Sequence, residues 1–174
     1  VLITGATSGI GYELANIFAE NGCNLVLVAR RADRLEKIKT EFEKDFGVSV
    51  IHIVKNLSDP AAVKEIAEEI KKQNIDIDIL INNAGIGVYG NFSHTEREKE
   101  LNMIKLNITA LTDLTKLLLG EMIKKRYGKI LNVASTAAFQ PGPKMAVYFA
   151  SKAYVLSFSE ALREEVKQYG ITVS

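Results

Sequence analysis

The sequence predicts an α/β fold in which a doubly wound parallel sheet carries helices on both faces. Short apolar runs of strand length alternate with amphipathic segments of helix length, which is the pattern of repeated βαβ units. The first apolar run leads directly into a glycine-rich turn and a helical pattern. With 174 residues, 47% of them hydrophobic, we expect a single domain over residues 1–174 with a substantial core.

Composition narrows the classes of partner. The 22 basic and 21 acidic residues give a net charge of +1 without a basic run, so we expect no nucleic-acid surface. We find no signal peptide and no apolar run of membrane-spanning length, so we expect a cytoplasmic location and no membrane partner. The one cysteine, Cys23, cannot form an internal disulfide, and we interpret it as a small core residue. No metal site is expected.

Both ends of the sequence lie inside predicted strands. Residue 1 already belongs to an apolar run, and residues 171–174 have the pattern of a sixth strand that has just begun. We therefore expect the domain to continue past Ser174, with its C-terminal part missing from this sequence.

The glycine-rich turn follows the strand predicted at residues 1–3. Glycines let the backbone come close to a pyrophosphate, and exposed N–H groups at a helix N-terminus favour its negative charge. A glycine cluster alone can be a tight turn without a ligand, and the spacing GxxxGxG is not the commoner GxGxxG. The strand before the turn and the helix after it nevertheless favour dinucleotide binding. The predicted cofactor contacts in this turn are Gly5, Thr7, Ser8, Gly9, Ile10 and Gly11.

The second predicted strand, residues 24–29, ends where a nicotinamide cofactor would place its adenine ribose. An acidic residue about 20 positions after the glycines would bind the 2′-hydroxyl of NAD(H). This chain has Ala29 there, and Arg30 comes next. A missing carboxylate beside a guanidinium suits a 2′-phosphate, so NADP(H) is favoured over NAD(H). The alternative is that Arg30 and Arg31 only begin the charged amphipathic helix predicted over residues 32–46.

The third and fourth strands are predicted at residues 48–54 and 77–81, with a helix between them. The fourth strand ends in the run Asn82-Asn83-Ala84-Gly85. Ligands bind at the carboxyl ends of parallel strands, although amide side chains there can also join neighbouring strands. We expect both roles, with at least one asparagine structural and the backbone near Ala84 and Gly85 lining the cofactor.

A long helical pattern covers residues 96–126, in one or two pieces. Asn107 interrupts its buried apolar stripe, and a buried amide must find partners such as a backbone carbonyl or an ordered water. The apolar face is longer than one sheet covers. We therefore expect a homodimer or homotetramer that packs through this segment and through the helix predicted at residues 148–169.

Tyr148 and Lys152 are four residues apart at the start of the last predicted helix, and Ser135 follows the fifth strand, residues 129–134. Positions i and i+4 share one helix face, so the ammonium can approach the phenol. A free tyrosine has a pKa of about 10, and bringing it near 7 requires roughly 4 kcal/mol of support for the phenolate, which a nearby cation helps to supply. Pairs with this spacing are also common on ordinary helix surfaces, so the pair needs supporting features.

Such supporting features are present, and together with the Tyr148–Lys152 pair they make the sequence resemble the short-chain dehydrogenase/reductase family. The matching motifs are Thr4-Gly5-xxx-Gly9-Ile10-Gly11, Asn82-Asn83-Ala84-Gly85, Asn107, Ser135 thirteen residues before Tyr148, and Tyr148-xxx-Lys152. They occur in the family's order and spacing over essentially the whole chain, and the glycine spacing resembles the single-domain branch. The resemblance implies a Rossmann-type sheet of strand order 3-2-1-4-5-6.

The resemblance also implies a role for each residue of the set. Tyr148 would be the general acid in reduction and the base in oxidation, and Ser135 would hydrogen-bond the substrate oxygen. Lys152 would hold the nicotinamide ribose and depress the pKa of the tyrosine. Asn107 would hold a water that links Lys152 to solvent.

Further cofactor contacts are implied at Asn83, Ala84 and Gly85, and beside the adenine. Where many members of the family have an aspartate at that place, this chain has Asn56, followed by Leu57. An asparagine loses the charge but can still hydrogen-bond.

The sequence therefore predicts an NADP(H)-dependent oxidoreductase that interconverts a carbonyl and an alcohol of a small molecule. A catalytically silent NADP(H)-binding sensor or scaffold is the alternative. Among enzymes, a 3-oxoacyl-thioester reductase and a reductase of small ketones or steroid-like alcohols both remain open. The residues expected to border the substrate do not choose between them because all are apolar: Ile86, Val88, Phe92, Phe139 and Met145.

Overall fold

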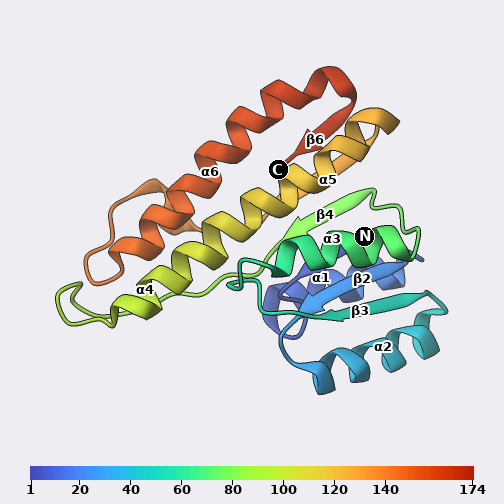
Figure 1. Ribbon diagram of the computed structural model, residues 1–174, viewed down its shortest axis with the longest axis horizontal. Coiled ribbons are helices and arrows are strands. Elements are labelled where there is room, and N and C mark those ends of the chain that lie inside the picture. Colours follow the sequence, from blue (N-terminus) through green and yellow to red (C-terminus); the bar gives the residue numbers. More distant parts are fainter.

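Six parallel strands form one sheet in a computed structural model that describes residues 1–174 (Figure 1). The strand order is β3-β2-β1-β4-β5-β6, which confirms the predicted order. Because the strands are parallel, their carboxyl ends lie along one edge of the sheet. The strands are β1 (Leu2–Thr4), β2 (Leu25–Ala29), β3 (Val50–Val54), β4 (Ile79–Asn82), β5 (Gly128–Asn132) and β6 (Ile171–Val173).

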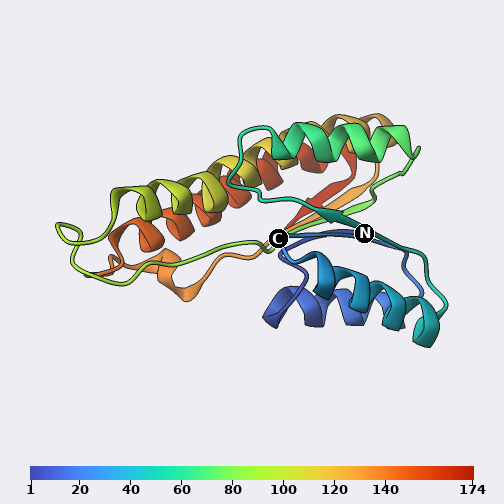
Figure 2. The ribbon, with the colours of Figure 1, turned by 60° about the horizontal axis from the view of Figure 1, so that its bottom comes forward.

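Helices cover both faces of the sheet, as Figure 2 shows. One face packs against α1 (Gly9–Glu20) and α2 (Ala32–Phe46), and the other packs against α3 (Ala62–Lys72), α5 (Leu111–Lys125) and α6 (Ala146–Val166). Neighbouring residues of a strand point to opposite faces, so each strand serves both cores. In β1, Leu2 belongs to the core under α3, α5 and α6, whereas Ile3 belongs to the core under α1 and α2.

The long helical segment predicted at residues 96–126 consists of three parts. The helix α4 (Arg97–Ile104) continues into a π-helical segment, η1 (Lys105–Ala110), which continues into α5. A π segment widens the helix locally, and such segments are frequent at functional sites. Asn107 lies in η1 and is 2% exposed, so the amide that interrupts the apolar stripe is buried in the π-helical segment.

Short 3₁₀ segments flank the last helix. The segment η2 (Thr136–Phe139) follows β5, and η3 (Lys167–Tyr169) joins α6 to β6. The helix α6 begins at Ala146, two residues before its predicted start. Figures 1 and 2 both show α4 and the first turns of α6 extending past the carboxyl ends of the strands. Tyr148 and Lys152 therefore lie on a part of α6 that extends beyond the strands.

Some boundaries differ from the predicted ones. Strand β3 begins at Val50 instead of residue 48, and β5 covers Gly128–Asn132 instead of residues 129–134. The predicted ranges follow apolar residues, which indicate burial, whereas a strand is defined by its pairing with neighbouring strands. Cys23 is half-buried and belongs to neither core, so its interpretation as a core residue was wrong. None of the helices combines the length and apolar character needed to cross a membrane.

Candidate active site

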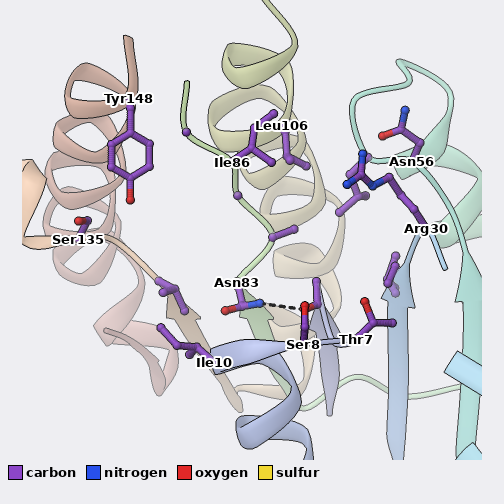
Figure 3. Close-up of a pocket in the computed structure, with 18 of the residues that line it drawn as sticks. Thr7, Ser8, Ile10, Arg30, Asn56, Asn83, Ile86, Leu106, Ser135 and Tyr148 are labelled. Carbon is purple, nitrogen blue, oxygen red and sulfur yellow. Dashed lines mark hydrogen bonds between the residues drawn. The ribbon is translucent and has the colours of Figure 1, made fainter. Parts of the chain in front are cut away.

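A cavity of about 980 Å³ opens at the carboxyl ends of the strands (Figure 3). It extends from the turns after β1, β2 and β3 to the start of α6, so residues far apart in the sequence line one space. Most of the predicted site residues line it: Gly5, Thr7, Ser8, Ile10, Arg30, Asn56, Leu57, Asn83, Ala84, Gly85, Ser135, Tyr148 and Lys152. Gly9, Gly11 and Asn107 do not.

The glycine-rich turn packs directly against the end of β4. Gly5 has φ +69°, and a Cβ atom there would lie 2.9 Å from the Cα of Ala84. A Cβ atom on Gly11 would lie 2.3 Å from Nδ2 of Asn83 and 2.4 Å from the carbonyl oxygen of Gly5. These distances are too short for any side chain, so both glycines are required by close packing within the turn. Gly11 therefore does not line the cavity, but its close packing against Gly5 and Asn83 fixes the turn that does.

The N-terminus of α1 faces the cavity with its amide groups free of a side-chain cap. Ser8 occupies the capping position, but its hydroxyl group makes no hydrogen bond to the first turn of the helix. Unpaired N–H groups at a helix N-terminus favour an anion such as a phosphate. This arrangement fits the pyrophosphate group of a dinucleotide.

The two asparagines after β4 have different roles. Asn82 is 4% exposed and donates hydrogen bonds to Thr115 Oγ1 and Asn132 Oδ1, both at 2.9 Å, which confirms a structural role for one asparagine. Asn83 donates to the carbonyl oxygens of Thr4 at 2.9 Å and Gly5 at 3.3 Å. Asn83 thereby lines the cavity and holds the glycine-rich turn in place.

The two adjacent arginines after β2 differ in the hydrogen bonds that their side chains make. Arg30 is exposed, lies near Asn56 at the cavity (Figure 3), and makes no hydrogen bond within the chain. Arg31 reaches back to the glycine-rich turn, where its guanidinium donates to the hydroxyl and carbonyl oxygens of Thr7 at 2.9 and 3.1 Å and to the hydroxyl of Ser8 at 3.1 Å. Arg30 is thus available to a ligand, whereas Arg31 is occupied by the turn.

Tyr148 and Ser135 direct their hydroxyl groups into the same end of the cavity (Figure 3). Lys152 is 6% exposed, and its Nζ atom lies 6.0 Å from the centre of the Tyr148 ring. The same ammonium group donates a hydrogen bond of 2.7 Å to the carbonyl oxygen of Val133. Burial lowers the pKa of Lys152, because removal from water disfavours the charged form.

Asn107 lies behind the cavity and supports its wall. Its Oδ1 atom accepts a hydrogen bond of 3.0 Å from the N–H group of Ile86, and its Nδ2 atom donates to the carbonyl oxygen of Ile86 at 2.9 Å and to Ser151 Oγ at 3.0 Å. A backbone carbonyl, one of the two kinds of partner that the sequence leaves open, thus pairs with this buried amide. The role of Asn107 in holding a water remains a prediction.

Several cavity residues were not predicted from the sequence. Arg31 and Lys55 follow the carboxyl ends of β2 and β3, so the rule that ligands bind at these ends could have identified them. Leu106 carries no such signal, because its place in the wall depends on how η1 packs. Of the five apolar residues expected to border a substrate, Ile86 and Met145 line the cavity, whereas Val88, Phe92 and Phe139 do not.

Comparison with known proteins identifies the family. The family model described as short chain dehydrogenase matches residues 1–174. A very-long-chain 3-oxoacyl-CoA reductase-like protein of Arabidopsis thaliana is 36% identical, and the match covers 99% of this chain and 56% of that protein. For the mouse (Mus musculus) 17-beta-hydroxysteroid dehydrogenase type 3 the identity is 35%, with 99% of this chain and 56% of that protein covered. The chain thus spans little more than half the length of these curated relatives.

A solved structure gives the same result. The short-chain dehydrogenase from Sphingobium yanoikuyae, in complex with NADPH, has a TM-score of 0.93 and 37% identity, with 99% of this chain and 67% of that chain covered. Similarity of sequence and of fold therefore extends over nearly every residue described above. Together, these matches show that the chain belongs to the short-chain dehydrogenase/reductase family.

Proposed function

We propose that the protein interconverts a carbonyl and an alcohol with NADP(H), with Tyr148 as the general acid in reduction and the general base in oxidation. The observation that carries this proposal is that Tyr148, Ser135, Lys152 and the glycine-rich turn meet in one cavity. Its oxidoreductase class follows from the family. The choice of cofactor and the role of each residue are the parts proposed here.

The residues of the cavity fit a nicotinamide dinucleotide. Gly5 and Gly11 leave no space for a side chain, and the first turn of α1 offers free N–H groups to the pyrophosphate. Asn83, Ala84 and Gly85 would line the middle of the cofactor, and Lys152 would bind the nicotinamide ribose. When bound, the nicotinamide supplies or accepts the hydride.

The environment of Arg30 supports NADP(H) rather than NAD(H). No carboxylate follows β2 to bind a ribose 2′-hydroxyl, because Ala29 occupies that position. Arg30 makes no hydrogen bond within the chain, so its donors are free for a 2′-phosphate, and Asn56 lies nearby. The Sphingobium yanoikuyae neighbour was crystallised with NADPH, which agrees with this choice.

At the other end of the cavity, proton transfer is assigned to the hydroxyl of Tyr148. In reduction, Tyr148 donates its proton to the carbonyl oxygen of the substrate, and Ser135 hydrogen-bonds the same oxygen. The ammonium of Lys152, beside the ring, stabilises the phenolate that remains. Ile86, Leu106 and Met145 give this end an apolar wall.

A turnover assay distinguishes an enzyme from the alternative, a catalytically silent NADP(H)-binding sensor. Purified protein is incubated with NADPH and a panel of ketones, 3-oxoacyl thioesters and 17-ketosteroids, and loss of NADPH is followed. We expect turnover of at least one class. Tight NADPH binding without turnover of any class would favour the sensor. The thioester and steroid arms are included because the two curated relatives carry those names.

A homo-oligomer that packs through α4, α5 and α6 is proposed as well. Leu101, Leu117 and Tyr154 are 38%, 45% and 37% exposed on these helices. Exposed large apolar side chains on helices are typical of a subunit contact.

A further inference from the structure

Two buried serines on α6 make the same pair of hydrogen bonds. Ser151 accepts from Asn107 Nδ2 at 3.0 Å and donates to the carbonyl oxygen of Tyr148 at 2.7 Å. Ser159 accepts from Asn132 Nδ2 at 2.9 Å and donates to the carbonyl oxygen of Val155 at 2.7 Å. We call these contacts the Ser151 clasp and the Ser159 clasp. Each joins α6 to an asparagine on another element.

The two clasps connect α6 to different parts of the molecule. The Ser159 clasp leads into the sheet, because Asn132 also accepts a hydrogen bond from Asn82. The Ser151 clasp leads to the cavity wall, because Asn107 also holds both the N–H and the carbonyl group of Ile86, at 3.0 and 2.9 Å. One clasp thus anchors the helix to the core, and the other anchors its first turns to the site.

The wall segment that Asn107 holds is in close contact with the catalytic pair. A Cβ atom on Gly85 would lie 3.4 Å from Asn107 Oδ1 and 3.5 Å from Lys152 Nζ. A Cβ atom on Gly87 would lie 3.3 Å from Cδ2 of Tyr148. Residues 85–87 therefore lie against Asn107, Lys152 and Tyr148 at once, so a small shift of α6 would change the shape of the cavity.

Together with the hydrogen bond from Lys152 Nζ to the carbonyl oxygen of Val133, the Ser151 clasp holds the first turns of α6. They extend beyond the strands (Figure 1), so the packing of α6 on the sheet does not by itself fix their position. Apolar packing is non-directional, whereas hydrogen bonds fix both distance and direction. Ser151 is 0% exposed, and its hydroxyl group both donates and accepts within the chain, so it does not contact a substrate.

We propose that Ser151 is a positioning residue, which fixes Tyr148 and Lys152 relative to the cavity by tying the start of α6 to Asn107 and the 85–87 segment. This inference rests on the proposed function. Catalysis depends on near-attack geometry, and a displacement of about 1 Å can reduce a rate by about 100-fold. Loss of the Ser151 clasp should therefore affect turnover more than binding.

The test compares Ser151→Ala with Ser159→Ala, which is a matched control because each change leaves one buried asparagine amide without its serine partner. We expect similar decreases in thermal midpoint. Only Ser151→Ala should lower kcat, by about 10-fold or more, with the Kd for NADPH within about twofold of wild type. Ser151→Cys retains a weak donor and acceptor and should recover part of kcat. Equal loss of kcat in the two alanine variants would overturn the proposal.

Hydrogen exchange gives a second test of the proposal, and this test does not depend on enzymatic activity. In Ser151→Ala, amides of residues 149–152 should exchange at least about 10 times faster than in wild type, whereas Ser159→Ala should leave that segment unchanged. Unchanged exchange in residues 149–152 of Ser151→Ala, or of Ser151→Gly if the alanine variant does not fold, would also overturn it. If the wild-type protein reduces no carbonyl, the proposed function fails, and exchange still decides whether the Ser151 clasp anchors the helix.

Discussion

At the scale of single residues, the arginines after β2 show how adjacent positions acquire different roles. Arg31 is held by Thr7 and Ser8, whereas Arg30 lies at the cavity without a partner in the chain. The sequence favours a 2′-phosphate contact at Arg30, with the alternative that both residues only begin the helix predicted over residues 32–46. The hydrogen bonds of Arg31 support the glycine-rich turn, and the 2′-phosphate contact is proposed for Arg30.

We expect Arg30→Ala to weaken NADPH binding by about 10- to 100-fold, the loss typical of a charge-assisted hydrogen bond, and to change NADH binding by less than about threefold. Arg31→Ala serves as the comparison, since loosening the turn should weaken both cofactors alike. Titration calorimetry with each nucleotide measures the difference. Equal losses of NADPH and NADH affinity in Arg30→Ala would contradict the assignment of the phosphate.

Lys152 carries a buried charge, and its lowered pKa makes stability depend on pH. In the folded protein the charged form is disfavoured, and this cost is fully present below the folded-state pKa. Between that pKa and the unfolded value of about 10.4, the unfolded chain binds more protons, so stability rises with pH. The cost disappears above the upper limit of this window.

Lys152→Met should therefore lose activity but gain stability relative to wild type at neutral pH, and the gain should shrink as pH rises through that window. Urea unfolding of both proteins at a series of pH values measures the difference in free energy. A difference that stays constant, or grows toward alkaline pH, would show that desolvation does not control the lysine.

At the scale of elements, the sequence predicts the order and type of nearly every strand and helix, because periodic apolar patterns report local structure. The α2 boundaries, residues 32–46, agree with the prediction. Asn107 interrupts the apolar stripe of the long helical pattern, but its spacing does not reveal a π segment. That change in winding depends on how Asn107 meets Ile86 and Ser151, and the latter is 44 residues away.

The candidate site also contains residues that local sequence patterns identify and residues whose roles depend on tertiary contacts. Motif residues such as Gly5, Tyr148 and Lys152 carry their chemistry in type and spacing, and the structure brings them to one cavity. The hydrogen bonds of Arg31 to Thr7 span 24 residues and have no local pattern. Contacts of this kind arise from tertiary packing, which is why Arg31 and Ser151 were not assigned roles from the sequence.

At the scale of the whole molecule, the exposed apolar residues of α4, α5 and α6 predict self-association. Leu117→Glu should shift the protein toward the monomer, because a charge would have to be buried in the contact. Ile17→Glu is the matched control, since Ile17 is 51% exposed on α1, which covers the other face of the sheet. Sedimentation velocity measures both variants. A wild-type protein that is monomeric at micromolar concentration would refute the proposed contact.

The architecture as a whole places the Tyr148 hydroxyl at one end of a cavity and the glycine-rich turn at the other, and the proposed reaction depends on Tyr148. The steady-state rate of carbonyl reduction in Tyr148→Phe is the most direct test. Tyr154→Phe is the control, because Tyr154 lies on the same helix and its hydroxyl pairs with Thr112 at 2.9 Å outside the cavity.

We predict that Tyr148→Phe lowers kcat by about 100- to 10,000-fold, the range for loss of a general acid, with the Kd for NADPH within about twofold of wild type. Tyr154→Phe should retain the wild-type rate. A Tyr148→Phe protein that reduces the substrate at a rate close to wild type would contradict the assignment of Tyr148 as the proton donor.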